Sequence, residues 1–340
     1  MHTASSNDWE GDENEGLHAK KYKPKPRTKL YGAISLADPA LLTRVGIVAS
    51  VFRTQTYVLE GDVLKTCSRV NELPNLPASK VVVGDKVEFQ CAGDFCQITK
   101  CLGRSSALMR QRKDTARITG EESVLHTVAA NIDCAIIVAA ARDPEFHPRF
   151  IDRYLIICEK NNIASIICIT KTDLVSISHE AIAIYRELGI PIVETSTVSG
   201  QGLEQLKDMI RGKTVVLVGN SGVGKSTLVN IFSNAAAART SDISKKSRRG
   251  RHTTTGSSLY KWDTDSYVID TPGIRLLGVD HINKSHLKTF FVEFAEPSQE
   301  CEFTNCLHDK ELICGVKTAL SLGGVTLARY ESYLAMLREE

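Results

Sequence analysis

The chain has 340 residues, enough for on the order of two or three domains of ~100–200 residues each. With 42% apolar and 24% charged residues it has the composition of an ordinary globular protein, which excludes a wholly disordered chain, a collagen and a coiled-coil rod. Its apolar runs fall far short of the ~20 residues that span a membrane, and the net charge of +2 does not by itself suggest a nucleic-acid partner.

The ten cysteines and the polar, acidic start of the chain bear on its compartment. A secreted disulfide scaffold is smaller and begins with an apolar signal segment, which residues 1–16 do not resemble. We therefore expect a cytoplasmic protein with no membrane association, whose clustered cysteines bind metal.

Residues 1–35 are predicted to be a disordered tail with an acidic patch over 8–15 and a basic patch over 20–29. Pro24 and Pro26 oppose a helix in the basic patch. Two roles stay open for the tail: a solubilising segment, or a basic arm that binds phosphate groups.

Residues 36–104 are predicted to form a small β-barrel of the OB-fold type, because five or six short strands are separated by Gly-Asp turns. OB-fold barrels commonly bind oligonucleotides, so we favour contact with nucleic acid over a structural spacer. The predicted strands are Val45–Val51, Thr56–Leu59, Val63–Ser68, Val81–Val83, Lys86–Gln90 and Phe95–Thr99.

Residues 105–282 show strands that alternate with helices, the pattern of an α/β domain whose parallel sheet binds ligands at the carboxyl ends of its strands. The predicted strands are Cys134–Ala141, Ile163–Thr170, Pro191–Glu194, Thr214–Val218 and Ser266–Asp270. The predicted helices are Phe150–Lys160, Glu180–Leu188 and one that starts at Lys225.

A phosphate-binding loop follows the predicted strand Thr214–Val218 and matches G-x-x-x-x-G-K-[ST] at every fixed position. Its backbone N–H groups and the helix N-terminus suit phosphate oxygens. Lys225 is expected at the β- and γ-phosphates and Ser226 at Mg²⁺. The predicted nucleotide-binding residues here are Gly219, Asn220, Ser221, Gly222, Val223, Gly224, Lys225, Ser226 and Thr227.

A second phosphate motif is predicted at Asp270-Thr271-Pro272-Gly273, where a strand ends. Asp270 would hold Mg²⁺ through water, and the Gly273 N–H would approach the γ-phosphate because glycine has no Cβ. By itself this tetrapeptide is an ordinary turn.

A guanine-binding motif is predicted at Thr170-Lys171-Thr172-Asp173, although a polar turn after a strand is an open alternative. The Asp173 carboxylate can accept hydrogen bonds from N1–H and N2–H₂ of guanine, a donor pair that adenine lacks. The Lys171 stem can lie over the base. A backbone N–H in the turn of Ser196, Thr197 and Val198 can bond to guanine O6.

The base motifs come before the phosphate motifs, the reverse of the order in an ordinary small GTPase. In the usual numbering of GTPase motifs, the two base motifs are G4 and G5, the phosphate loop is G1, the switch segment is G2 and Asp270–Gly273 is G3. The resulting order G4-G5-G1-G2-G3 predicts a circularly permuted GTPase domain, which is feasible where the original termini lie close together.

Residues 283–340 are predicted to be a mainly helical, zinc-binding domain. Cys301, Cys306, His308 and Cys314 offer three thiolates and one imidazole, a donor set that suits one structural, tetrahedral Zn²⁺. The last helix, Val325–Leu337, places Leu327, Tyr330, Leu334 and Leu337 on one face, which we expect to dock on the zinc module or the GTPase domain.

The remaining seven cysteines are expected to be small core residues, and we treat the even spacing of three of them as coincidence. They are Cys67, Cys91, Cys96, Cys101, Cys134, Cys158 and Cys168, the evenly spaced ones being Cys91, Cys96 and Cys101.

The barrel, the permuted GTPase and the Cys/His cluster together resemble the RsgA (YjeQ) family of small-ribosomal-subunit-dependent GTPases over nearly the whole chain after about Leu30. Four further segments carry the resemblance: Ala130–Asp133, Ile151–Leu155, Arg251–Thr255 and Asp270–Ile274. Thr170 departs from it, because many GTPases carry Asn there and a hydroxyl replaces only part of the Asn contacts.

The resemblance implies that GTP hydrolysis with Mg²⁺ is coupled to binding and release of the small ribosomal subunit and its rRNA, with the chain, a monomer, acting as a late assembly or maturation factor. Ile274 occupies the position of the water-orienting Gln of Ras-type enzymes and cannot do its work. His252 in the switch segment is expected to orient the water. The resemblance points to Thr254 as the Mg²⁺ ligand, although spacing leaves Thr253 and Thr255 open.

The segment Lys245–Arg251 carries five cations, which predict either a solvated loop or a switch that touches rRNA phosphate. Two other functions remain: a P-loop ATPase or nucleotide kinase, against which Asp173 argues, and a non-catalytic GTP-sensing RNA chaperone.

Overall fold

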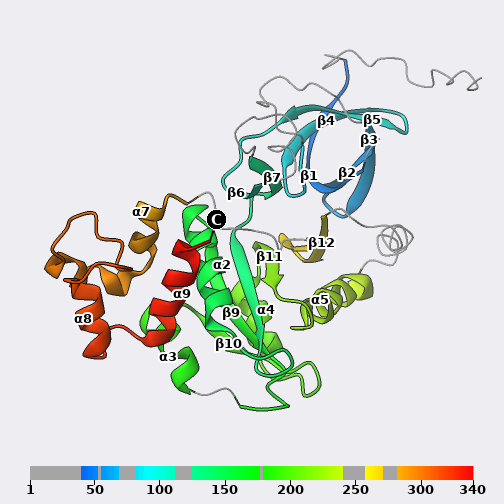
Figure 1. The fold of residues 1–340 in the computed structure, drawn as a ribbon. Helices are drawn as coiled ribbons and strands as arrows, with labels where there is room; N and C mark the ends of the chain where they lie inside the picture. Colours follow the sequence, from blue (N-terminus) through cyan, green and yellow to red (C-terminus); the bar gives the residue numbers. More distant parts are fainter. Residues whose placement is uncertain are drawn as a thin grey trace, which may run out of the picture. The chain divides into compact units, whose positions relative to one another are not determined.

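The computed structural model describes residues 40–52, 55–68, 81–111, 125–176, 179–239, 257–270 and 282–339 (Figure 1). The predicted tail over 1–35 lies outside these residues. None of the described helices combines the length and apolar character needed to cross a membrane.

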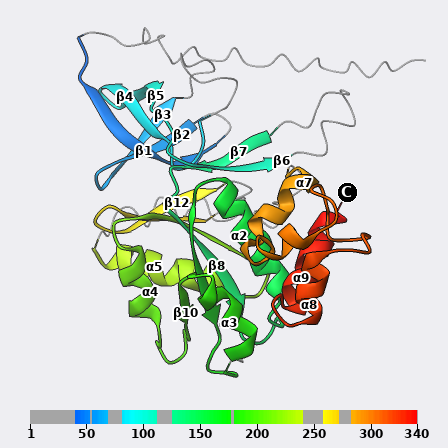
Figure 2. The same cartoon turned by 90° about the vertical axis from the view of Figure 1, so that its left-hand side faces the viewer.

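The five N-terminal strands form a closed, OB-like barrel (Figure 2). Antiparallel pairs join β1 to β2, β2 to β3, β4 to β5 and β1 to β4, and a parallel pair of β3 with β5 completes the ring. Val81–Val83, predicted as a strand, makes only a single bridge from Val83 to Ala129. The strands are β1 (Thr43–Val51), β2 (Gln55–Glu60), β3 (Val63–Ser68), β4 (Lys86–Ala92) and β5 (Phe95–Cys101).

A two-stranded sheet that the sequence pattern did not predict follows the barrel, made of β6 (Ala107–Gln111) and β7 (Leu125–Ala130). The chain then passes through Asn131, whose amide oxygen accepts from the Ser105 N–H at 2.9 Å and whose amide nitrogen donates to the Gly84 carbonyl at 2.9 Å. The Asp133 carboxylate next accepts from the Thr214 N–H at 2.8 Å. The family-like segment Ala130–Asp133 thus ties together three stretches of backbone.

The predicted parallel sheet is present. Its strands run in the spatial order β10-β9-β8-β11-β13, with β12 antiparallel to β13 at one side. Strand β12 also pairs with β1 at Ser258 and Ser50. The strands are β8 (Cys134–Ala140), β9 (Ala164–Thr170), β10 (Ile192–Glu194), β11 (Thr214–Gly219), β12 (Ser258–Asp263) and β13 (Ser266–Asp270).

Helices cover both faces of this sheet, α2 (Pro148–Lys160) and α3 (His179–Glu187) on one and α4 (Leu203–Ile210) and α5 (Lys225–Arg239) on the other (Figure 1). Side chains of β8 alternate between the two apolar cores, as the two-residue period of a strand requires. Every residue of β8 is therefore buried, which explains its continuous apolar sequence.

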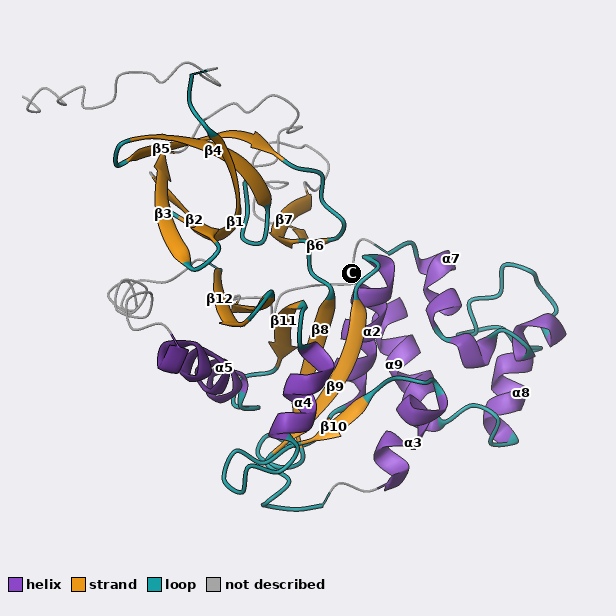
Figure 3. Cartoon of the chain, turned by 180° about the vertical axis from the view of Figure 1, so that it is seen from behind, coloured by secondary structure: helices purple, strands orange, loops and turns teal. Residues whose placement is uncertain are grey.

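The C-terminal part consists of helices and loops (Figure 3). Helix α9 buries Arg329, Tyr330 and Tyr333, whereas Leu327, which we predicted on its docking face, is 60% exposed. The prediction fails at Leu327 alone, because Tyr330, Leu334 and Leu337 pack against the apolar core. A hydrophobic pattern also ignores Arg329, which lies buried in the same contact. The elements are α7 (Lys284–Leu287), three 3-10 turns at Lys288–Phe290, Val292–Phe294 and Pro297–Glu300, α8 (Gly315–Ser321) and α9 (Leu327–Leu337).

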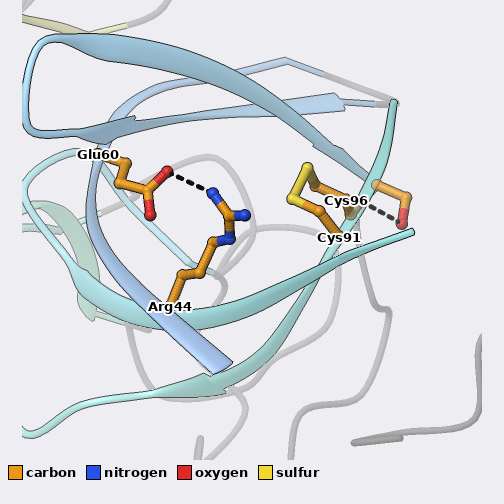
Figure 4. The surroundings of a disulfide bond; sticks show 5 residues. Arg44, Glu60, Cys91 and Cys96 are labelled. Carbon is orange, nitrogen blue, oxygen red and sulfur yellow. Dashed lines mark hydrogen bonds and ion pairs between the residues drawn. A yellow bond between two sulfur atoms is a disulfide. The ribbon is translucent and has the colours of Figure 1, made fainter. Parts of the chain in front are cut away.

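The structure also corrects the expectation that all seven cysteines outside the metal cluster are free core residues. Cys91 and Cys96 form a disulfide (Figure 4). Strands β4 and β5 are a hairpin around Gly93 and Asp94, and its register sets these two cysteines directly opposite each other. The other five cysteines are free, and all of them except Cys101 are buried.

Candidate functional site

The residues predicted to bind nucleotide gather at one edge of the parallel sheet. Strands β9, β10, β11 and β13 run in the same direction, so Thr170, Glu194, Gly219 and Asp270 end them on the same side. Ligands of open α/β sheets bind at this edge. Motifs that lie far apart in the sequence therefore meet here.

The phosphate-binding loop connects β11 to α5 in the predicted way. Gly222 and Gly224 have φ values of +80° and +96°, a left-handed region that other residues rarely occupy. The Lys225 ammonium donates to the carbonyl oxygens of Gly219 and Asn220 at 2.7 and 2.5 Å. The lysine thus lies across its own loop, where a phosphate group can take over its hydrogen bonds.

Asp270 ends β13 beside this lysine. Burial raises the pKa of the Asp270 carboxyl, and the Lys225 ammonium opposes that shift. Ser226 and Thr227, at the start of α5, are exposed and accessible to a ligand. Two of the predicted Mg²⁺ ligands, Ser226 and Asp270, are among the described residues. Asp270 is the last residue of β13, and Ser226 lies in the helix that follows the neighbouring strand β11.

The base motif is joined to the phosphate loop through a buried hydrogen bond. The Thr170 hydroxyl donates to the Val223 carbonyl at 2.6 Å, while the Ala139 carbonyl is farther away, at 3.3 Å. One hydroxyl proton can serve only one of these acceptors. Thr170 thus makes a single hydrogen bond to the predicted phosphate loop.

Asp173 is exposed, and its position is set by Ser196. The Ser196 hydroxyl donates to Asp173 Oδ1 at 2.6 Å and accepts from the N–H groups of Val198 and Ser199, both at 3.2 Å. The amide of Val198, one candidate for guanine O6, is therefore already engaged by Ser196. Thr197 and Val198 are exposed in the same turn.

Lys171 follows Thr170 with a left-handed backbone, φ +60°. Its ammonium donates to the Asp143 carbonyl. This contact stretches the aliphatic stem from the end of β9 toward the loop after β8. The remaining predicted residues of the site, His252, Thr253, Thr254, Thr255 and Gly273, lie outside the described residues, as does the basic segment Lys245–Arg251.

The four predicted zinc ligands converge, with donor atoms all within 4.8 Å of one another. His308 Nδ1 lies 3.6 Å from Cys301 Sγ and 3.4 Å from Cys314 Sγ, and the two sulfur atoms are 3.9 Å apart. Zn–S bonds of ~2.3 Å and Zn–N bonds of ~2.0 Å in a tetrahedron require S···S separations of ~3.8 Å and S···N separations of ~3.5 Å. The donor set therefore fits a tetrahedral zinc ion.

The surroundings of the cluster hold it in place. Ser298 Oγ lies 3.3 Å from Nε2 of the fully buried His308, an outer partner of the kind that orients metal ligands. Burial and then the Lys288 ammonium lower the pKa of His308 to about 4, which favours the neutral, metal-binding imidazole. Glu311, which no sequence pattern indicated, accepts with its carboxylate from the N–H groups of Leu307 and Asp309 at 2.7 and 2.9 Å.

A buried ion-pair network, also missed, joins the last helix to the GTPase domain. Arg329 donates to Asp152 Oδ1 at 2.7 Å and to Glu293 Oε1 at 2.6 Å, and Tyr185 donates to Asp152 at 2.9 Å. Burial raises the pKa of Asp152, against the attraction of Arg329. The only signal in the sequence was the family-like segment Ile151–Leu155, which contains Asp152.

Comparison with known proteins gives consistent matches. A family model described as RsgA GTPase matches residues 101–280. A protein of Chlorobaculum tepidum named small ribosomal subunit biogenesis GTPase RsgA is 35% identical over 309 residues, covering 87% of this chain and 97% of the relative. A Pseudomonas putida protein with the same name is 34% identical over 302 residues, covering 86% and 85%.

Two solved structures resemble the chain over most of its length. YjeQ from Thermotoga maritima has a TM-score of 0.63 at 31% identity and covers 87% of this chain and 98% of its own. YloQ, described as a circularly permuted GTPase, has a TM-score of 0.61 at 28% identity and covers 87% and 94%. Because the family model spans more than half of the chain and the relatives match along most of their length, the chain belongs to the RsgA GTPase family.

Proposed function

We propose that this chain hydrolyses GTP and couples hydrolysis to binding and release of the small ribosomal subunit, as a late assembly or maturation factor. The observation that carries the proposal is the bond from Thr170 to the Val223 carbonyl, because it joins a guanine motif to a phosphate loop at one sheet edge. The names of the relatives support the ribosomal role.

The motif order assigned to the domain is G4-G5-G1-G2-G3, which agrees with the description of YloQ as circularly permuted. Guanine is recognised by Asp173, which Ser196 orients at 2.6 Å, with Lys171 along the base. This pair favours GTP over ATP, because adenine has no paired donors for the carboxylate. The phosphates bind to the loop Gly219–Thr227 and to the Gly273 amide.

Mg²⁺ is held by Ser226, Asp270 and Thr254 and supplies charge neutralisation for the phosphates. The Lys225 ammonium leaves the Gly219 and Asn220 carbonyls for the phosphate oxygens. His252 orients the attacking water. The Cys301, Cys306, His308 and Cys314 donor set holds one structural Zn²⁺, which its spacing supports.

The domains are a tail over 1–35, an OB-fold barrel over 36–104, the GTPase domain over 105–282 and the zinc domain over 283–340. The partner is the small subunit with its rRNA, contacted by the barrel, the zinc domain and the Lys245–Arg251 segment, and the protein acts as a cytoplasmic monomer. Contacts with phosphate make binding weaken as salt rises.

The test compares the GTP hydrolysis rate of the full chain with and without purified small ribosomal subunits. We expect stimulation of at least tenfold, and we expect ATP at equal concentration not to displace labelled GTP. Lys225→Ala, which removes the cation of the phosphate loop, controls for contaminating GTPases. An unstimulated rate, or displacement by ATP, contradicts the proposal.

A second arm separates the GTPase from a non-catalytic GTP-sensing chaperone. His252→Ala is expected to keep GTP binding and to lose the stimulated turnover, because only the water-orienting group is removed. If the variant and the unmodified chain turn over GTP at the same rate, His252 is not the catalytic residue.

A further inference from the structure

The barrel contains a pair of cysteines with no part in the proposed GTPase chemistry. Cys91 is the last residue but one of β4 and Cys96 is the second residue of β5, and their disulfide crosses the hairpin with 4.1 Å between the Cα atoms (Figure 4). None of the other eight cysteines, three of which are the predicted metal ligands, forms a disulfide. Cys91 and Cys96 thus form the one disulfide in the described part of the chain.

Cys96 also lies on the strand pair that closes the barrel. Within the described residues, strands β3 and β5 are joined through two residue pairs, Cys67 with Cys96 and Ser68 with Gln97, and we call this pairing the seam. The Ser68 hydroxyl adds a 3.4 Å bond to the Cys96 carbonyl. The longer β4–β5 pairing holds the other side of β5. A bond at Cys96 thus acts on a residue that itself belongs to the seam.

Cys96 is paired with Cys91 on β4 and with Cys67 on β3, and these three cysteines differ in solvent accessibility. Cys91 is partly exposed, Cys96 is 6% exposed and Cys67 is fully buried. Burial raises the pKa of the Cys67 thiol to about 12, against the nearby Lys65, so Cys67 stays protonated and unreactive. A dissolved reagent therefore reaches Cys91 first.

The disulfide closes a short loop, with a sequence separation of only five residues. A short loop restricts the unfolded chain less than a long one, so the bond adds less global stability than a long-range disulfide would. Its effect is local and falls on the hairpin and the seam. A partly accessible disulfide with a local effect is of the labile, regulatory kind rather than the structural kind.

We propose that Cys91 and Cys96 form a reversible dithiol–disulfide site that reacts with low-molecular-weight disulfides and, when oxidised, fixes the seam of the barrel. The Cys91 thiolate attacks one sulfur of the reagent, which forms a mixed disulfide and releases one thiol. The Cys96 thiolate then attacks Cys91 Sγ, which forms the intramolecular bond and releases the second thiol. Two protein thiols lose two electrons and two protons, and the reagent disulfide is reduced to two thiols.

The experiment treats the reduced full-length protein with oxidised glutathione, quenches with acid, labels free thiols and maps them by mass spectrometry. We expect Cys91 and Cys96 to lose labelling together as a linked Cys91–Cys96 peptide appears, and Cys67 to remain reduced. Equal labelling of Cys91 and Cys96 before and after treatment overturns the proposal.

Two variants test the order of attack. In Cys96→Ser, the resolving thiol is absent, so a glutathione adduct is expected to accumulate on Cys91. Cys67→Ser is the matched control and is expected to form the linked peptide at the unmodified rate. The assignment of Cys91 as the entry thiol is contradicted by the opposite pattern. In that pattern Cys91→Ser carries a glutathione adduct on Cys96, while Cys96→Ser carries none on Cys91.

The effect on the seam is measured by hydrogen exchange of the oxidised and reduced unmodified protein, which needs no variant. Amides at residues 67–68 and 95–98 are expected to exchange several-fold more slowly in the oxidised form, while those of β8 do not change. Identical rates at the seam refute its redox control. Neither measurement uses GTP or ribosomes, so the result is independent of the proposed function.

Discussion

The hydroxyl of Thr170 carries the link between the two halves of the candidate nucleotide site. It is buried and donates to Val223 in the phosphate loop at 2.6 Å. An Asn side chain has an amide N–H₂ and a carbonyl, so it can make more bonds at this place than a hydroxyl with one proton. The consequence is a site that depends on a single short hydrogen bond.

Thr170→Val tests this dependence, because valine has nearly the same shape and no hydroxyl. The Val223 carbonyl then loses its donor, at a cost of about 1–2 kcal/mol, so the Kd for GTP is expected to rise about tenfold. Titration of a fluorescent GTP analogue measures the change. Thr170→Ser, which keeps the hydroxyl, is the control, and an unchanged Kd in Thr170→Val shows that the bond does not order the loop.

At the scale of elements, α9 is attached to the rest of the chain by polar as well as apolar contacts. Arg329 is buried between Asp152 of α2 and Glu293, with its guanidinium 4.4 Å from the centre of the Phe291 ring. Tyr330 and Tyr333 donate to the carbonyls of His308 and Leu307 at 2.6 and 2.7 Å. One helix therefore contacts both the GTPase domain and the metal-binding loop.

Arg329→Met leaves the carboxylates of Asp152 and Glu293 near one another without their cation. Breaking a buried ion pair in this way costs about 3–5 kcal/mol, so a large drop in the free energy of unfolding is expected in urea titrations. Arg338→Met, at the residue directly after α9, removes only an exposed pair with Asp309, and a much smaller loss is expected. Equal effects of the two substitutions argue against the network as the attachment of α9.

At the scale of the whole molecule, the metal-binding loop and α9 form one unit, because the tyrosines of α9 bond to backbone carbonyls beside His308. A metal that folds the loop also supports the docking of α9. We therefore expect a metal bound at the loop to add stability to this whole unit, beyond its apolar contacts with the main core.

Removing the metal with a chelator is expected to lower the Tm of the purified protein by at least ~5 °C, because zinc binding contributes directly to folding. Calorimetry measures the Tm, and elemental analysis checks for one zinc per chain. His308→Ala is expected to show the same low Tm without chelator. His286→Ala, at an exposed histidine, is the control and should leave the Tm unchanged. If the chelator changes neither the Tm nor the metal content, the structural zinc is disproved.

Local patterns in the sequence determined most of the strands and helices, the phosphate loop in its strand-to-helix setting and the four converging metal ligands, because each depends on residues close together in the chain. The structure was needed for the Cys91–Cys96 bond, which hairpin register decides. It was also needed for the hydrogen bond from Thr170 to Val223 and for the buried face of α9 around Arg329. The contacts of Thr170 and Arg329 join residues 53 and 177 positions apart, which only the packing of the folded chain brings together. The two cysteines are near one another in sequence, but their spacing does not fix the hairpin register that sets them opposite each other.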